Sequence, residues 1–276
     1  MRVEETISNH YGQKNLETII LAALENAGKD INALTRDDIA SFDEFHFGGR
    51  TETRTLARLA KLEKGMHVLD VGSGVGGAAR TLAREFACHV TGLDLTEEYV
   101  RAAEMLTNHV GLGDKVSFQQ GSALEMPFED SFFDAVWLQH VSMNIENKRK
   151  LYGEITRVIR PGGCLAIHEI MEGPASNVHY PVFWASNESI SFLEKPDIIR
   201  EMLIESWYTE LEWNDVTQRA MEFTRKRHDE TAKAGPAPLG LDVIVPKDVP
   251  QKVANSLKNL EEGRIVVIQA VFERIA

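Results

Sequence analysis

The sequence predicts a doubly wound α/β fold, and two patterns in the middle of the chain carry this prediction. Short runs rich in β-branched and aromatic residues begin at residue 66: MHVLDV, CHVTGLDL, KVSFQQ, FDAVWLQ and CLAIHEI. Between these runs, apolar residues recur at helical spacing over 76–86, 97–110 and 146–159. Strands that alternate with helices in this way pair in parallel through right-handed crossovers. Such sheets bind ligands at the carboxyl ends of their strands.

The prediction extends to both sides of this core. Apolar residues recur at helical spacing over 15–27 and 51–62, so helices are expected before the sheet. Beyond residue 170 the sequence predicts, in order, an aromatic lid, a helix and two strands: SNVHYPVFWASNESISFLEKP, 196–206, TELEWNDV and GRIVVIQAVFERI. The long connection between the last two strands, 217–263, is expected to have a function, because unstructured connections of that length are uncommon in domains.

Composition limits the classes of partner. The 276 residues are 43% hydrophobic, which is enough to bury a full core. The formal net charge of −12 and the pI near 5.3 oppose binding to nucleic acid or to an anionic membrane, because like charges repel. The opening run MRVEETISNHYG lacks the apolar core of a signal peptide, and no apolar run has the length of a membrane span. We therefore expect a cytoplasmic protein.

The two cysteines are expected to be structural residues of the core and not reactive or metal-binding residues. Cys88 and Cys164 each lie in an apolar, strand-like run without a neighbouring Cys or His at ligand spacing. We expect both to be buried thiols and not members of a disulfide or zinc site. No metal site is predicted.

The run VLDVGSGVGGAAR, residues 68–80, is a glycine-rich turn that follows the first predicted strand. Gly72, Gly74 and Gly77 fit the dinucleotide pattern G-x-G-x-x-G, whereas Gly72, Gly74 and Gly76 fit the G-x-G-x-G pattern of S-adenosylmethionine enzymes. Either ligand requires glycines, because the turn is tight and the backbone must approach the cofactor closely. The loop alone leaves both cofactors open.

Two carboxylates at strand ends narrow this choice. Asp70 directly precedes the turn, where it would repel a pyrophosphate but attract the ammonium and sulfonium groups of S-adenosylmethionine. Asp94 ends the second strand and can accept hydrogen bonds from both ribose hydroxyls of either cofactor. Leu95 would then touch an adenine face. Asp70 argues against a dinucleotide, and Asp94 supports a nucleoside.

The rest of the sheet carries a family resemblance. GSALEMPFEDSFFDAVWLQHVSMNI, followed by RVIRPGGCLAIHEI, resembles the class I S-adenosylmethionine-dependent methyltransferases. The resemblance is close over residues 42–171 and looser over the last strands. It implies a Rossmann-like, seven-stranded, mostly parallel sheet with an antiparallel last strand. It also implies S-adenosylmethionine as the cofactor, with S-adenosylhomocysteine as its product.

The same resemblance implies a division of the chain. Residues 1–62 would form a helical cap over the active site, and 63–276 would form the methyltransferase domain. Lid insertions are expected within that domain at about 172–193 and 217–263.

Carried over residue by residue, the resemblance implies cofactor contacts at the ends of four strands. The expected residues are Asp70, Gly72, Gly74, Asp94, Leu95, Ser122, Ala123 and Gln139. The first three would line the methionine end, Asp94 would hold the ribose, and Ser122 and Ala123 would flank the adenine. Many relatives have Asp in place of Ser122, where a carboxylate accepts from the adenine amino group; a hydroxyl accepts more weakly.

Two further segments refine the resemblance. FDEFHFGGRTET resembles the segment that closes over the cofactor in ubiquinone-biosynthesis, tocopherol and glycine/sarcosine methyltransferases, and Phe45 and Gly48 are expected to contact the cofactor there. LQHVSMNIENKRKLY resembles phosphoethanolamine and sarcosine/dimethylglycine methyltransferases. His140 falls on a histidine that the phosphoethanolamine enzymes use near the substrate. The tyrosine that partners it there has no match in this chain, so the acceptor does not carry over.

Candidate catalytic and substrate residues follow from position. His140 is the candidate base, because imidazole titrates near neutral pH and this residue follows the fourth strand, where the transferred methyl group would emerge. The alternative is a structural or substrate-positioning role. A substrate wall is predicted from Tyr11, His46, Tyr180, Phe183 and Trp184. The alternative for these side chains is that they pack the lid.

The sequence therefore predicts a methyltransferase with a small-molecule acceptor. The sarcosine/dimethylglycine resemblance favours an amine, and the ubiquinone-type resemblance favours a ring carbon or hydroxyl, as in a quinone-like natural product. A phosphorylated acceptor is less favoured, because the aromatic run 179–193 has no Arg or Lys to hold phosphate. Two other classes stay open: an NAD-dependent oxidoreductase, against which Asp70 argues, and a noncatalytic cofactor-binding protein. The oligomeric state does not follow from the sequence.

Overall fold

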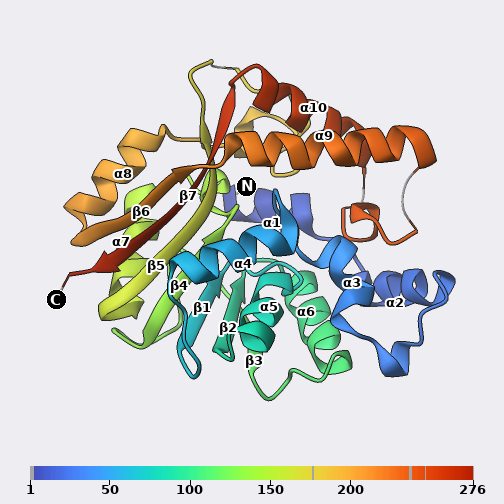
Figure 1. Cartoon of the computed structure of the whole chain (residues 1–276), viewed down its shortest axis with the longest axis horizontal. Coiled ribbons are helices and arrows are strands. Elements are labelled where there is room, and N and C mark those ends of the chain that lie inside the picture. The colour runs from blue at the N-terminus through green and yellow to red at the C-terminus, as the bar shows by residue number, and fades with distance from the viewer. Residues whose placement is uncertain (1–2, 176, 236–237, 246, 276) are drawn as a thin grey trace.

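Seven strands form one sheet at the centre of the molecule, in the order β3-β2-β1-β4-β5-β7-β6 (Figure 1). The computed structural model describes residues 3–175, 177–235, 238–245 and 247–275. The strands are β1 (His67–Val71), β2 (His89–Asp94), β3 (Val116–Gln120), β4 (Phe133–Gln139), β5 (Ile159–Glu172), β6 (Tyr208–Asp215) and β7 (Ile265–Arg274). β7 pairs antiparallel with β5 and β6, and the other neighbours pair in parallel. The predicted sheet, with its antiparallel last strand, is confirmed.

The strand order reverses at β1. Asp70 on β1 pairs with Gly92 of β2 on one side and with Trp137 of β4 on the other. The chain continues from β1 to β2 and β3 on one side, and β4 and β5 then follow on the other side of β1. This change of direction opens a crevice at the carboxyl ends of the strands. The residues that end β1, β2 and β4 therefore meet at one edge of the sheet.

Helices cover both faces of the sheet. They are α4 (Gly49–Leu59), α5 (Gly77–Glu85), α6 (Glu97–His109), α7 (Lys148–Val158) and α8 (Pro196–Glu205). α4 and α5 pack on the face that presents Val68 and Trp137, and α7 and α8 pack on the face that presents Leu69 and Leu138. Because neighbouring residues of a strand point to opposite faces, burial of both faces produces nearly continuous apolar strands. The helices predicted from 76 to 206 are confirmed to within two residues at each end.

The remaining helices are α1 (Val3–Tyr11), α2 (Leu16–Asn26), α3 (Arg36–Asp43), α9 (Thr217–Ala234) and α10 (Val249–Glu261). Figure 1 shows α9 and α10 alongside each other at the top of the molecule. Leu24 of α2 and Ile39 of α3 share an apolar cluster with Leu241 and Ile244, which lie between α9 and α10. The long connection before the last strand therefore packs against the N-terminal helices, which lie far from it in sequence.

The described ranges contain no helix long and apolar enough to cross a bilayer, and no group of three or more His, Cys, Asp or Glu placed to hold a metal ion. Cys88 is buried, Cys164 is half-buried, and both are free thiols. Burial raises the pKa of Cys88 to about 11, so this thiol is protonated at neutral pH and packs as an apolar group.

Candidate active site

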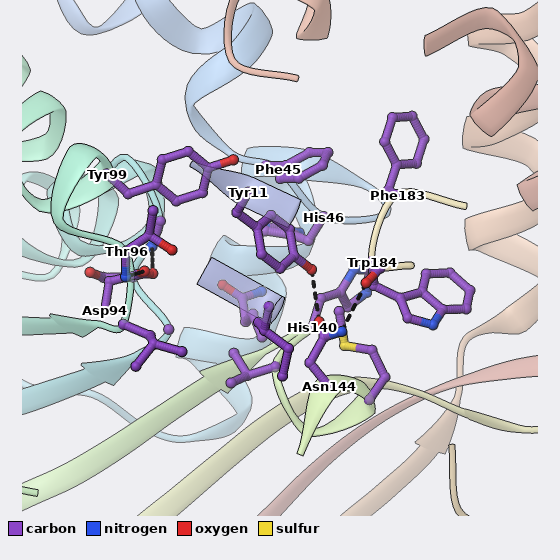
Figure 2. A pocket seen from close by; sticks show the side chains of 18 of the residues that line it. Tyr11, Phe45, His46, Asp94, Thr96, Tyr99, His140, Asn144, Phe183 and Trp184 are labelled. Atoms are coloured by element: carbon purple, nitrogen blue, oxygen red, sulfur yellow. Dashed lines mark hydrogen bonds between the residues drawn. The ribbon is translucent and has the colours of Figure 1, made fainter. Parts of the chain in front are cut away.

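A cavity of about 310 Å³ lies at the carboxyl ends of the strands (Figure 2). Its wall includes fourteen of the sixteen residues that the sequence predicted for the site: Tyr11, Phe45, His46, Asp70, Gly72, Gly74, Asp94, Leu95, Ser122, Ala123, Gln139, His140, Phe183 and Trp184. Strand ends supply the floor, and α1, α9 and the segments around residues 46 and 183 supply the remaining walls.

Gly48 and Tyr180 do not line this cavity. Gly48 has a φ of 84° directly before α4, and a Cβ there would lie 2.2 Å from Cγ of Glu52, so this glycine serves the turn itself. Tyr180 packs against the buried cluster that contains Val182 and Trp184. Gly48 was expected at the site from the FDEFHFGGRTET segment and Tyr180 from the aromatic run. In the structure, both residues serve local turn geometry or packing outside the cavity.

The glycine turn between β1 and α5 shapes the floor of the cavity. Gly72 has a φ of 70°, and a Cβ there would lie 2.4 Å from Val141 Cγ2. Gly74 has a φ of 53°, and no atom would lie within 4 Å of an added Cβ. The N–H of Gly74 donates to Asp94 Oδ2 at 2.8 Å, which ties the turn to the end of β2.

Asp94 is held by the backbone. Besides the bond from Gly74, its Oδ1 accepts a hydrogen bond from the N–H of Thr96 at 2.9 Å. Burial raises the pKa of Asp94, while these backbone hydrogen bonds oppose the rise. Each carboxylate oxygen has a second lone pair, so Asp94 has capacity for donors from a ligand.

Asp70 is only partly satisfied by the protein. Its Oδ2 is buried without a hydrogen-bond partner among the residues described. Burial, and then the charges of Asp94 and Glu44, raise the pKa of Asp70 to about 8. Ser73 Oγ and Gln139 Nε2 are likewise buried without a described partner. Unpaired buried polar atoms are uncommon because they cost free energy, so their gathering around one cavity fits a polar ligand with both donors and acceptors.

His140 follows β4 in a left-handed conformation, with a φ of 54°. Its N–H donates to the carbonyl of His168 at 2.9 Å, and the two rings stack with centroids 5.0 Å apart. Its Nε2 is buried without a partner in the described part of the chain. Burial, followed by the nearby His168 and His46, lowers the pKa of His140 well below its usual value. The ring is therefore neutral at physiological pH.

Glu169 on β5 fixes the turn that carries His140. Its carboxylate accepts the N–H of Val141 at 3.0 Å and the N–H of Ser142 at 2.9 Å, and the hydroxyl of Ser142 also donates to it. Burial raises the pKa of Glu169 to about 7. Sequence reasoning missed this residue; the available signal was a glutamate within the apolar run CLAIHEI.

Asn144, in the short helix after β4, joins three distant segments. Tyr11 Oη donates to Asn144 Oδ1 and Asn144 Nδ2 donates to the carbonyl of Trp184, both at 2.8 Å (Figure 2). Asn144 Nδ2 also donates to the carbonyl of Ile190 at 2.8 Å. His10 Nε2 lies 3.0 Å from the carbonyl oxygen of Phe183. The predicted lid and α1 therefore meet over the cavity. The sequence did not predict Asn144 as a site residue, although it lies shortly after the end of β4, where site residues were expected.

Ser122, after β3, also contacts α1. Its hydroxyl donates to the carboxylate of Glu4, and its Oγ accepts the N–H of Leu124 at 3.0 Å. Glu4 also lines the cavity. A carboxylate from α1 therefore lies next to Ser122, the position at which many relatives have Asp and this chain has a hydroxyl. No local sequence pattern predicts this contact, because it joins residues 118 positions apart.

The fold and the strand-end site define the class of protein. A family model described as a methyltransferase domain matches residues 69–167, which run from β1 to β5 and include the glycine turn, Asp94 and His140. This is the stretch that forms the floor of the cavity.

Curated relatives agree with the family model. The chain is 30% identical over 225 residues to methyltransferase GfsG of Streptomyces halstedii, a match that covers 80% of this chain and 77% of that protein. It is 41% identical over 114 residues to sterol 24-C-methyltransferase ERG6B of Gibberella zeae, which covers 41% and 30% of the two chains. It is 28% identical over 207 residues to glycine/sarcosine/dimethylglycine N-methyltransferase of Actinopolyspora halophila, which covers 71% and 35%.

The chain thus belongs to the class I S-adenosylmethionine-dependent methyltransferases. It spans about a third of the length of the sterol and the glycine/sarcosine/dimethylglycine relatives. The family assignment removes the NAD-dependent oxidoreductase as an alternative.

Proposed function

We propose that the protein methylates an amine of a small molecule, with the cofactor on the floor of the cavity and the acceptor between His140 and the lid. The observation that carries this proposal is the convergence of Asp70, Asp94 and the unpartnered Nε2 of His140 on one cavity. Each of the three supplies a different part of the chemistry.

The cofactor fits the unpaired groups of the floor. Asp70 would pair with the ammonium of the methionine end, and the free lone pairs of Asp94 would accept the ribose hydroxyls. The open space above Gly74 lets the backbone approach the ligand. Leu95 and Ala123 would contact the adenine, with Ser122 and Glu4 at its edge.

When bound, S-adenosylmethionine supplies a methyl group on a sulfonium, which leaves as a neutral thioether. The protein has to align the acceptor, exclude water and receive a proton. Neutral His140 carries one ring proton; in the tautomer that holds it on Nδ1, Nε2 can accept a hydrogen bond from an acceptor N–H and take the proton as the new bond forms. Glu169 and His168 hold the backbone that aims this ring, which makes them positioning residues.

Two features support an amine. The LQHVSMNIENKRKLY run resembles amine methyltransferases, and the glycine/sarcosine/dimethylglycine relative bears an N-methyltransferase name. Phe45 and Phe183 also line the cavity, with ring centroids 5.3 Å apart, and aromatic faces attract alkylated ammonium groups. The second candidate is methyl transfer to carbon or oxygen of an apolar molecule. The name of the sterol relative and the apolar lining from Phe47, Met143 and Ile170 favour it.

We further propose that residues 1–62 act as a cap and that 172–193 and 217–263 act as lids. Tyr11, Trp184 and Phe223 from these three segments all line the cavity. The hydrogen bonds through Asn144 link the first two. A small molecule is the acceptor that such an enclosed site fits.

The test is incubation of the purified protein with methyl-labelled S-adenosylmethionine and a small-metabolite extract, followed by mass analysis of each labelled product. Cofactor binding is measured in parallel by calorimetry. A product labelled on nitrogen is the expected result. Label on carbon or oxygen would favour the second candidate, and binding without label in any extract would favour a noncatalytic binding protein. Absence of cofactor binding would contradict the assignment of the floor.

A further inference from the structure

Helix α9 contributes a cation to the wall of the cavity. Phe223, Thr224 and Arg227 line it, a spacing that places the three side chains on one face of the helix. Arg227 is the one Arg or Lys among the described residues of the lining. The aromatic run 179–193 contains no Arg or Lys, and this cation comes from the other proposed lid, 217–263.

Arg227 makes no ion pair with a carboxylate of the described residues, although the charge of Glu230 on the same helix acts on it from further away. Its guanidinium lies over the ring of Phe223, 5.7 Å from the centroid, and makes no hydrogen bond or ion pair with any residue the structure describes. Other arginines of the same helix are paired: Arg219 binds Glu52, and Arg225 binds Glu261. Arg227 thus differs from its helical neighbours in facing the cavity unpaired.

Three carboxylates of the cavity have other partners. Asp94 accepts backbone N–H groups, Glu44 accepts the hydroxyl of Thr53 at 2.6 Å, and Asp43 pairs with Arg80 at 3.0 Å. Burial lowers the pKa of Arg227, which reflects the cost of removing its charge from water. A ligand anion would offset that cost, and the planar guanidinium suits two parallel hydrogen bonds to carboxylate or phosphate oxygens.

We propose that Arg227 binds an anionic oxygen group, carboxylate or phosphate, on the methyl acceptor. This proposal rests on the proposed function, because it assumes that the acceptor occupies the lid side of the cavity. The stack on Phe223 holds the guanidinium plane in place, and the aromatic and apolar walls receive the body of the molecule. The acceptor would then carry an anionic group in addition to the amine that is methylated.

Three probes with the same phenyl body test the preference: phenylacetate, phenyl phosphate and 2-phenylethylammonium. Their dissociation constants for the protein saturated with S-adenosylhomocysteine are measured by ligand-observed NMR. We expect at least one anion to bind about tenfold or more tightly than the ammonium probe. The tighter of the two anions identifies the carboxylate or the phosphate as the group recognised.

Variants locate the effect. Arg227→Gln is expected to remove the preference for anions. Arg227→Lys is expected to keep part of it, because lysine retains the positive charge but lacks the paired N–H donors of the guanidinium. Arg225→Gln is the matched control on the same helix and is expected to keep the full preference. Equal binding of all three probes, absence of binding by both anions, or an unchanged preference in Arg227→Gln would overturn the proposal.

The cofactor is tested separately. If Arg227→Gln weakened binding of S-adenosylhomocysteine, the guanidinium would serve the cofactor carboxylate, and the acceptor proposal would be overturned. If the wild-type protein failed to bind S-adenosylhomocysteine at all, the proposed function would fall. The probe series, repeated without it, would still decide whether Arg227 binds anions.

Discussion

Cofactor binding should release a proton from Asp70, because burial raises the pKa of this carboxyl group in the free protein. The carboxyl group has a pKa of about 8, so at pH 7 it is mostly protonated. An ammonium group bound beside it favours the carboxylate, and the carboxyl group then loses its proton on binding. The affinity for S-adenosylhomocysteine should therefore rise with pH until the free protein has itself lost the proton.

The size of the effect follows from the fraction already ionised. With a pKa of about 8, that fraction rises about ninefold from pH 6 to pH 7 and about fivefold from pH 7 to pH 8. The apparent association constant should rise by the same factors. Ionising Asp70 at pH 7 costs about 1.4 kcal/mol, against about 1.5–3 kcal/mol for a charged hydrogen bond. Asp70→Asn should therefore bind almost as well as wild type at pH 6 and clearly worse at pH 8.

Calorimetric titration at pH 6, 7 and 8, in two buffers of different ionisation enthalpy, measures both the affinity and the protons released. Asp70→Asn is the control, because any titration of the ligand itself contributes equally in both proteins. A wild-type affinity that stayed constant from pH 6 to 8, or an Asp70→Asn protein with the wild-type slope, would refute the assignment of Asp70 to the methionine end.

Three further variants test the other parts of the site. His140→Ala should lower single-turnover methyl transfer at least about tenfold while calorimetry shows S-adenosylhomocysteine binding within about twofold of wild type; loss of binding would make His140 structural. Asp94→Ala should weaken the same ligand by about 2 kcal/mol, since charged ribose contacts are lost, and an unchanged dissociation constant would contradict the ribose assignment. Glu169→Gln presents an amide donor to one of two backbone N–H groups, so urea unfolding should show a loss of about 1–3 kcal/mol. Wild-type stability would mean that the turn does not depend on the carboxylate.

The sheet and the floor of the cavity could be predicted because local sequence specifies them. Strand and helix periods set the order of elements, and parallel strands bring Asp70, Asp94 and His140 to one edge whatever their separation in the chain. The glycine turn could be predicted for a similar reason. Its left-handed positions at Gly72 and Gly74 are conformations that other residues rarely adopt.

The walls could not be predicted because they depend on contacts between distant segments. Arg227 lines the cavity because α9 packs on α10 and β7, and no local sequence pattern encodes these contacts. Glu4 beside Ser122 and Asn144 beneath Tyr11 are likewise set by the docking of α1. In such cases the sequence supplies the side chain, and tertiary packing decides whether it faces the ligand.

The docking of α1 links the two halves of the site. At nine residues, α1 is too short to be stable alone in water, so its order depends on tertiary contacts. Those contacts are divided: Glu4 reaches Ser122 on the proposed adenine side, and Tyr11 and His10 reach Asn144 and the lid on the acceptor side. Any ligand that strengthens one set stabilises the helix that makes the other. In the proposed arrangement, a cofactor that strengthened the contact between Glu4 and Ser122 would also stabilise the helix that reaches Asn144 and the proposed lid.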